Sequence, residues 1–423
     1  MPDFDPDAYL GSLEPVGWRL GLERMRLLTT ALGLPQHRFA SIHVVGTNGK
    51  SSVTRMTAAL LEAHGLAAGA CVSPHAERWS ERTLIGGEEV DAGRWAVAVE
   101  AVARAAEGVD RALDEGDAVT QFEAATAAAF VALANAGVEA AAIEAGLGGR
   151  LDATNTIPSR VTVLTSIGLD HTDWLGETEL EIAAEKLAVL RDQTTLVLGR
   201  VSPEVAALAE RTAAERGALL LHAPEDPGPG VELRARGSFQ RRNFALARTA
   251  VEAFLGELDP AAIAAVARSV AVPGRLEQIA ATPPTLLDAA HNPPGVAALA
   301  EALPAVVGGR RLVACLAILA DKDAAAMIAE LAPLLDRVVC TEIPAAALAG
   351  HGRPGAASHP AGALAAICAD EGLEAEAEPD FEAALLRASA LAAESPQGAL
   401  LVAGSHYAIA PARAALGARA AAR

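Results

Sequence analysis

The chain has 423 residues, of which 52% are hydrophobic and 3% aromatic, and its formal net charge is −19 at pH 7. This length predicts two or three domains with sizeable cores, and the acidic balance argues against nucleic acid and anionic membranes as partners. The chain lacks a membrane-length apolar run, a signal-peptide pattern and a metal-binding cysteine spacing, so we expect a cytoplasmic protein with reduced cysteines.

The first motif is an apolar run, a glycine-bracketed turn and a helical pattern. Residues 42–45 predict a buried strand, and a helix is expected over residues 51–61. Such a turn presents backbone N–H groups and a lysine to phosphate. Val44 replaces the first glycine of the full Walker pattern, so an ordinary strand-to-helix turn remains the alternative. The turn comprises Gly46, Thr47, Asn48, Gly49, Lys50, Ser51 and Ser52.

Lysine is rare in this chain. Only Lys50, Lys186 and Lys322 occur, whereas the other 31 basic residues are arginines. A compositional bias toward arginine explains the scarcity but not the positions that keep lysine. Each retained lysine is therefore a candidate for a role that needs a compact ammonium group or a primary amine.

Polar side chains follow three predicted strands, over residues 67–72, 138–143 and 161–167, with Ala-rich helices over 91–115 and 120–136 between the first two. Ser73, Glu144 and His171 stand just past these strands. Ligands bind at the carboxyl ends of parallel strands, and this donor set suits a Mg²⁺ that keeps water and phosphate ligands. The alternatives are a helix cap or surface residue for Glu144 and a hydrogen-bonded loop histidine for His171.

The rest of the chain continues the alternation of strands and helices. A helix over 179–190 carries Lys186 beside Glu185, where a surface ion pair is the alternative, and a helix over 240–255 carries Asn243. A boundary near 271–275 predicts domains 1–271 and 272–423. The second, smaller parallel α/β domain has expected strands at 285–287, 312–319, 337–341 and 399–402, and Asp288 and His291 follow the first of them.

At the level of motifs, the chain resembles the folylpolyglutamate synthase/dihydrofolate synthase family of the Mur ligase superfamily. The resemblance rests on motifs that run in family order over nearly the whole chain. They are the turn at 46–52, Ser-Pro-His at 73–75 with Glu81 and Arg82, Thr-x-Phe-Glu at 120–123, Glu-x-Gly-Leu-Gly-Gly-Arg-Leu-Asp-Ala-Thr-Asn at 144–155, Ser-Ile-Gly-Leu-Asp-His-Thr-Asp-Trp-Leu-Gly at 166–176, Glu-Lys at 185–186, Pro-Gly-Arg at 273–275, Leu-Asp-Ala-Ala-His-Asn-Pro at 287–293, Asp-Lys-Asp at 321–323 and Gly-Ser at 404–405.

The resemblance implies a Mur-ligase-like α/β fold, with an N-terminal P-loop ATPase domain and a smaller Rossmann-like glutamate-ligase domain. It implies an ATP-dependent amide ligase that phosphorylates a carboxylate of dihydropteroate or a reduced folate and joins L-glutamate to it. Mg²⁺ is implied as cofactor, a monovalent cation is left open, and a monomer is expected.

The resemblance also assigns roles residue by residue. Lys50, His171 and Lys186 would be catalytic, with Lys186 carbamylated, and Ser73, Glu144 and His171 would hold the metal. The turn at 46–52, Asn243, Arg275, Asp288 and His291 would bind ATP. Arg82, Thr120, Phe122, Glu123, Leu151, Asp152 and Ala153 would bind the acceptor substrate. Ser51 replaces the glycine usual in the family, so either Ser51 or Ser52 is the hydroxyl facing the metal.

Two other readings stay open at this point. One is a Mur-superfamily ligase for a different carboxylate and amino acid. The phosphate loop begins within about 45 residues of Met1, which leaves no room for the N-terminal UDP-binding domain of a peptidoglycan ligase. The other is a nucleotide-binding regulator without catalysis, against which the joint presence of Glu144, His171 and Lys186 argues.

Overall fold

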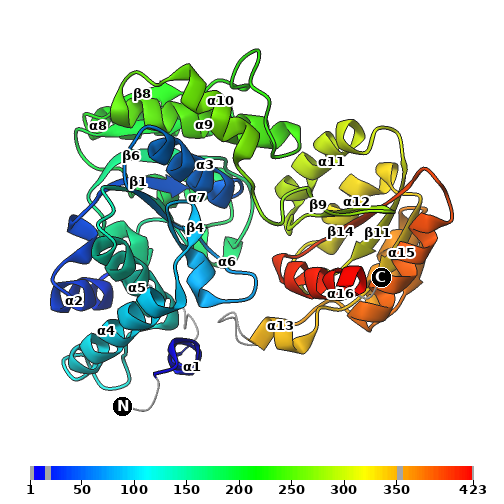
Figure 1. Ribbon diagram of the computed structural model, residues 1–423, viewed down its shortest axis with the longest axis horizontal. Coiled ribbons are helices and arrows are strands. Elements are labelled where there is room, and N and C mark those ends of the chain that lie inside the picture. The colour runs from blue at the N-terminus through cyan, green and yellow to red at the C-terminus, as the bar shows by residue number, and fades with distance from the viewer. Residues whose placement is uncertain (1–3, 15–20, 350–355, 422–423) are drawn as a thin grey trace. The chain divides into compact units, whose positions relative to one another are not determined.

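The structure is a computed structural model that describes residues 4–14, 21–349 and 356–421. The chain divides into two compact units, one of residues 1–234 with 241–270 and the other of residues 235–240 with 271–423. Each unit is an α/β layer structure around its own sheet (Figure 1). The α/β fold class expected from the sequence is confirmed.

The first unit is built on an eight-stranded sheet with the order β4-β3-β2-β5-β1-β6-β7-β8. Neighbouring strands from β2 to β8 pair in parallel, and β3 and β4 add an antiparallel edge. Its strands are β1 (Ala40–Val45), β2 (Ala68–Cys71), β3 (Thr83–Ile85), β4 (Glu88–Glu89), β5 (Ala140–Glu144), β6 (Ser159–Leu164), β7 (Thr195–Leu198) and β8 (Leu219–His222).

The helices of this unit cover both faces of the sheet. They are α1 (Pro6–Ser12), α2 (Glu23–Ala31), η1 (Pro35–His37), α3 (Lys50–Ala63), η2 (Trp79–Arg82), α4 (Ala92–Asp110), α5 (Gln121–Asn135), η3 (Ala153–Thr156), α6 (Thr172–Leu175), α7 (Glu179–Leu187), α8 (Pro203–Glu215), α9 (Ser238–Leu255) and α10 (Pro260–Ser269). The first residues of α9 belong to the second unit. In Figure 1, α2, α4 and α5 gather on one side of the unit, and α9 and α10 on the other.

The alternation of side chains along the central strand β5 explains these two layers. Ala141 and Ile143 pack into the cluster that includes Phe130 of α5, whereas Ala142 packs with Ala58 of α3 on the opposite face. Successive side chains of a strand point to opposite faces, so both faces of β5 are buried. Alanine at these positions lets both helices approach the sheet closely.

The second unit has a six-stranded sheet with the order β13-β12-β11-β14-β10-β9, parallel except at β9. Leu286, Leu316 and Leu401 face one hydrophobic cluster, and Leu287, Cys315 and Val402 face the other. Its elements are β9 (Glu277–Ala281), β10 (Pro284–Leu287), α11 (Pro293–Val307), β11 (Arg311–Leu316), α12 (Ala324–Leu331), η4 (Ala332–Leu334), β12 (Arg337–Cys340), α13 (Ala345–Ala349), α14 (Ala361–Asp370), β13 (Glu374–Ala377), α15 (Phe381–Ala393), β14 (Gly398–Ala403), η5 (His406–Ala408) and α16 (Ile409–Ala421).

Some element bounds differ from those expected. The strand expected over 161–167 ends at Leu164, because Thr165 and Ser166 turn to bond the loop after β1. The β3–β4 hairpin, β9 and β13 were not predicted. The four cysteines are free and buried, and no helix in the described part of the chain is long and apolar enough to cross a membrane.

Candidate active site

The loop between β1 and α3 is shaped by two glycines that no other residue replaces without displacement. Gly46 has φ +148°, and a Cβ there would clash with the Thr165 hydroxyl. Gly49 has φ +85°, and a Cβ there would lie 2.7 Å from Oδ1 of Asn243. Both are conformations that L side chains rarely adopt. The predicted nucleotide residue Asn243 of α9 therefore lies directly against the loop.

Hydrogen bonds fix this loop to the segment that follows β6. The Thr47 amide donates to the Ser166 carbonyl at 2.8 Å, and the Asn48 amide donates to Ser166 Oγ at 3.1 Å. Thr165 Oγ1 donates to the Asn48 carbonyl at 2.6 Å. Among the residues that the structure describes, no side chain caps the start of α3 at Gly49, so its first-turn N–H groups and positive dipole end are available to an anion.

Glu144 forms hydrogen bonds with residues that follow the two strands on either side of its own. It is the last residue of β5 and is 2% exposed. Its Oε1 accepts a hydrogen bond from Ser51 Oγ at 2.9 Å, and its Oε2 accepts one from the Ser73 amide at 3.0 Å. The strand order β2-β5-β1 explains the meeting, because Ser73 follows β2 and Ser51 follows β1. Of the two candidate serines, Ser51 is the one that touches the carboxylate.

This donor set fits a divalent cation that retains water. Within residues 4–14, 21–349 and 356–421, no three His, Cys, Asp or Glu side chains gather in a way that could hold a metal. One carboxylate with two serines leaves coordination positions for water and phosphate oxygens, which is how Mg²⁺ is usually bound at phosphate sites. Glu144, Ser51 and Ser73 are thus suited to a nucleotide-bound metal.

His171 lies in the same segment that bonds the phosphate loop. It has φ +52° and immediately precedes α6. Its amide donates to Oδ1 of Asp170 at 3.0 Å, and its ring Nε2 is 3.9 Å from the same oxygen. A non-glycine residue in the left-handed region is uncommon and often occurs at functional sites. Its role as a metal ligand stays a prediction.

Lys186 is a buried amine on α7. It is 4% exposed, and burial lowers its pKa to about 7, with the nearby Lys50 charge acting in the same direction. Asp170, Asp152 and Glu185 partly oppose this shift. The lowered pKa makes the neutral amine, the form that reacts with electrophiles, accessible near neutral pH.

The glycine-rich loop 146–152 lies against the helix that carries Lys186. A Cβ at Gly149 would lie 2.8 Å from the Glu185 carbonyl oxygen and 2.9 Å from Cα of Lys186. Asp152 holds the loop in shape, because its carboxylate accepts from the Leu147 amide at 2.8 Å and the Thr154 amide at 3.0 Å. Burial raises the pKa of the Asp152 carboxyl.

Phe122 packs against the same loop, at Gly146. A Cβ at Gly146 would overlap the Phe122 ring, so the absence of a side chain there makes room for it. Phe122 is the second residue of α5 and lies two positions after Thr120, which caps the helix. Of the other predicted substrate residues on the loop, Leu151 is exposed and Ala153 is buried in the core.

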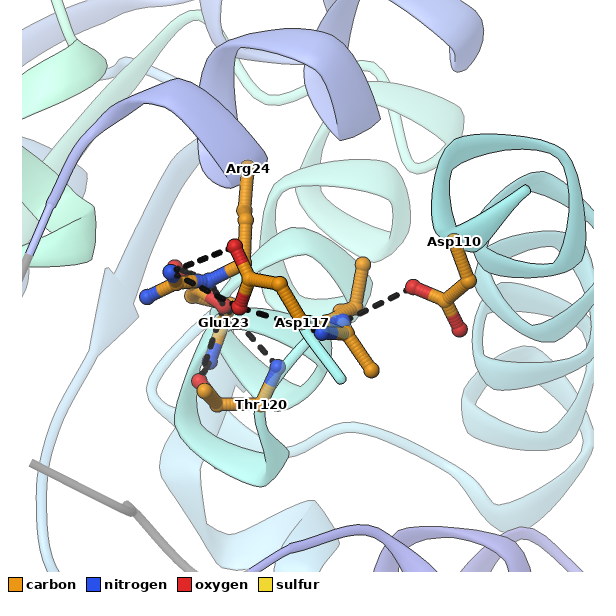
Figure 2. Close-up of polar contacts among 7 residues, drawn as sticks. Arg24, Asp110, Asp117, Thr120 and Glu123 are labelled. Atoms are coloured by element: carbon orange, nitrogen blue, oxygen red, sulfur yellow. Dashed lines mark hydrogen bonds and ion pairs between the residues drawn. The ribbon is translucent and has the colours of Figure 1, made fainter. Parts of the chain in front are cut away.

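Glu123 is engaged within the protein, as Figure 2 shows. It accepts hydrogen bonds from the amide and hydroxyl of Thr120, both at 2.9 Å, and forms an ion pair with Arg24 at 3.0 Å. Arg24 also contacts Asp117 at 3.3 Å. Arg24 was not among the predicted site residues, and nothing local in the sequence links it to a residue 99 positions away.

Arg82 belongs to a compact cluster on the segment after β2. Its Nε donates to Nδ1 of His75 at 2.9 Å, and its guanidinium lies 4.3 Å from the centre of the Trp79 ring. The His75 and Trp79 rings are 4.5 Å apart. Arg82 is buried, so this cluster fixes its orientation.

The second unit contains three residues that the sequence predicts to bind the nucleotide, namely Arg275, Asp288 and His291. Asp288 follows β10 and is buried, and its carboxylate accepts from the Leu276 amide at 2.9 Å and the Ala290 amide at 2.8 Å. Burial raises the pKa of Asp288, and the nearby Arg275 charge opposes that rise. His291 Nδ1 lies 2.9 Å from the Ala289 carbonyl oxygen, and Asn292 caps α11.

Comparisons with known proteins assign most of the chain to one family. Residues 44–221 match the family model "Mur ligase middle domain", and residues 274–406 match "Mur ligase, glutamate ligase domain". A dihydrofolate synthase/folylpolyglutamate synthase of Mycobacterium tuberculosis is 36% identical over 76% of this chain and 74% of its own length. The folylpolyglutamate synthase of Lacticaseibacillus casei is 32% identical over 80% of this chain and 84% of its own.

Solved structures give the same result. Mycobacterium tuberculosis folylpolyglutamate synthase complexed with ADP and AMPPCP superposes with a TM-score of 0.86 at 32% identity, covering 98% of this chain and 99% of that chain. Escherichia coli FolC in complex with DHPP and ADP superposes with a TM-score of 0.83 at 27% identity, covering 98% and 97%.

Proposed function

The chain belongs to the Mur ligase family, in its dihydrofolate synthase/folylpolyglutamate synthase branch, and we propose that it uses ATP to join L-glutamate to dihydropteroate and to reduced folates. The observation that carries the proposal is the contact of Ser51 and Ser73 with Glu144 beside the uncapped start of α3. This contact supports the proposal because it brings the predicted phosphate-binding loop and a carboxylate suited to a metal ion to one edge of the sheet. A ligase for another carboxylate and amino acid, the alternative left open by the sequence, is not favoured.

The chemistry follows from the charges at this edge. An acceptor carboxylate attacks the γ-phosphorus of ATP, ADP leaves, and the amino group of L-glutamate then displaces phosphate from the acyl phosphate and loses a proton. The first step brings two anions together, so positive charge at the γ-phosphate is needed. Lys50 and the first-turn amides of α3 supply it. A divalent cation held by Glu144, Ser51, Ser73 and His171 would add charge at the β- and γ-phosphates, and we propose Mg²⁺.

We further propose that Lys186 acts as a carbamate. The neutral Nζ attacks CO₂, and the product loses a proton to give an anionic oxygen ligand on a long arm. Burial and the lowered pKa of Lys186 favour the neutral amine that this reaction needs. Arginine cannot substitute for it, because its guanidinium stays protonated.

The acceptor side of the proposal rests on Phe122 and the glycine-rich loop. The Phe122 ring packs on Gly146, which lies two residues along the chain from the proposed metal ligand Glu144. A planar pterin ring is suited to an aromatic surface of this kind. Arg82, Thr120, Leu151, Asp152 and Ala153 complete the proposed acceptor set, and Asn243, Arg275, Asp288 and His291 the proposed nucleotide set. We propose a monomer, and we propose no role for a monovalent cation.

A side-by-side assay tests the proposal. ADP release is measured with ATP, Mg²⁺ and L-glutamate, using dihydropteroate in one series and tetrahydrofolate in the other, and the products are identified by mass. We expect glutamate-dependent turnover with both acceptors. Turnover with one acceptor would restrict the activity to that substrate, and ATP binding without turnover of either would refute the ligase assignment.

A further inference from the structure

The first unit has a pocket of about 620 Å³ at the sheet edge opposite the phosphate loop. Ser159, the first residue of β6, and Thr194, just before β7, line it together with α2 and the turn η3. The phosphate loop follows the carboxyl ends of the same parallel strands. A six-residue strand spans about 20 Å, so the pocket is a separate site.

Four basic side chains line this pocket and no acidic one does. They are Arg26, His37, Arg160 and Arg191. The formal net charge of the chain is −19, so this group of basic side chains forms a locally positive region. In the part of the chain that the structure describes, Arg26 and Arg160 have no carboxylate partner, and both are exposed.

Arg191 is held in place without being neutralised. Its Nη2 donates to the Asn155 carbonyl at 2.6 Å, to Asn155 Oδ1 at 2.8 Å and to the Ile157 carbonyl at 3.1 Å. These acceptors orient the guanidinium but carry no charge. Burial lowers the pKa of Arg191, the charges of Arg216 and Arg26 lower it further, and the Asp192 charge opposes the shift.

Two buried polar side chains of the lining have unused hydrogen-bonding capacity. Gln36 and Ser159 are each 2% exposed. Within the described residues, Gln36 Oε1 and Ser159 Oγ have no hydrogen-bond partner. Both atoms lie beneath the pocket surface, so the arginines, and not these two groups, supply the contacts to a ligand.

We propose that this pocket binds a small multivalent anion that carries at least two phosphate or carboxylate groups. Arginine forks bind both groups with charge-assisted hydrogen bonds. The volume lies in the range of ligand pockets, about 300–1,000 Å³, and exceeds what a single phosphate fills. Arg26 on α2, Arg160 on β6 and Arg191 on the segment before β7 supply the positive charge, and the Arg160 guanidinium also lies 5.8 Å from the centre of the Phe254 ring of α9.

Calorimetric titration tests the site in the full-length protein. The nucleotide site is kept filled with saturating ADP in metal-free buffer, and tricarballylate and inorganic tripolyphosphate are titrated in separate arms. The test variant is Arg26→Ser/Arg160→Ser. The control variant, Arg111→Ser/Arg268→Ser, loses two exposed arginines outside the pocket lining, so its net charge changes equally.

We expect one equivalent of at least one probe to bind wild type and the control alike, with affinity lowered at least about tenfold in the pocket variant. The stronger probe identifies the ligand class as carboxylate or phosphate. Equal affinity in both variants, or no binding of either probe to wild type, would overturn the proposal. Thermal unfolding without probe should differ little among the three proteins, because the substituted arginines have no described ion pairs and only Arg160 has an aromatic contact, with Phe254.

Discussion

The buried ion pair between Arg24 and Glu123 predicts a large loss of stability on Arg24→Met. The two side chains are 9% and 6% exposed, and Arg24 Nε lies 3.0 Å from Glu123 Oε2 (Figure 2). Removing one partner of a buried pair typically costs about 3–5 kcal/mol, because the other charge stays buried. Glu123 keeps its two bonds from Thr120, so we expect the lower end, about 3 kcal/mol.

A double variant separates the charge from the packing. In Arg24→Met/Glu123→Gln, the side-chain oxygen of Gln still accepts from the Thr120 amide while the buried charge is gone. Replacing both partners of a buried pair is often nearly neutral, so this variant should lie within about 1 kcal/mol of wild type. The mutant cycle should then give a coupling energy of about 2 kcal/mol or more.

The free energy of unfolding of each variant is measured by urea titration, with tryptophan fluorescence as the signal. All four tryptophans lie within residues 1–174, so their signal reports on the first unit. Because Phe122 lies between Thr120 and Glu123, Arg24→Met should also raise KM for the acceptor more than KM for ATP. A loss below about 1 kcal/mol, or a double variant no more stable than the single one, would refute the reasoning.

Three further predictions concern the active site. The lowered pKa of Lys186 means that the native state binds fewer protons than the unfolded state between about pH 7 and its ordinary value of 10.5, so stability rises with pH there. In buffer free of CO₂, where Lys186 is a free amine, Lys186→Met should therefore be more stable than wild type at pH 7 in urea unfolding, with an advantage that disappears near pH 10.5, and the variant should be inactive in assays with bicarbonate; an advantage independent of pH would contradict this. Gly149→Ala should displace the loop from α7 and lower kcat, whereas the control Gly108→Ala on α4, which has no close neighbour, should not. Ser51→Ala should raise the Mg²⁺ concentration for half-maximal rate about tenfold, and Ser52→Ala should change it less; the reverse order would assign the metal to Ser52.

The sequence predicted correctly that polar side chains follow the ends of neighbouring parallel strands. Glu144 ends an alanine-rich strand and is followed by glycines, and the parallel order β2-β5-β1 then brings it to the serines after its neighbours. Such proximity can be foreseen because parallel strands end at one edge. The strand predicted over 161–167 is too long for a tertiary reason. β6 ends at Leu164, and the Thr165 hydroxyl then donates to the Asn48 carbonyl in the loop that follows the neighbouring strand β1.

Other features were missed for different reasons. The β3–β4 hairpin had a local signal, the Gly86-Gly87 pair, both with positive φ, which is typical of a two-residue turn. Arg24 had none, because its partner Glu123 is 99 positions away and is selected only when α2 packs near α5. The basic pocket was missed likewise, since its arginines come from separate segments.

The distribution of lysine gives this protein an unusual chemical surface. None of its three lysines is exposed, because Lys186 is buried and Lys50 and Lys322 are partly covered. Reagents that attach dyes, cross-linkers or supports through side-chain amines will therefore find few targets. Those that do react are directed to the phosphate loop, the buried Lys186 or the segment at Lys322. Immobilisation or labelling of the active enzyme will need arginine- or tag-directed chemistry instead, because the four cysteines are buried as well.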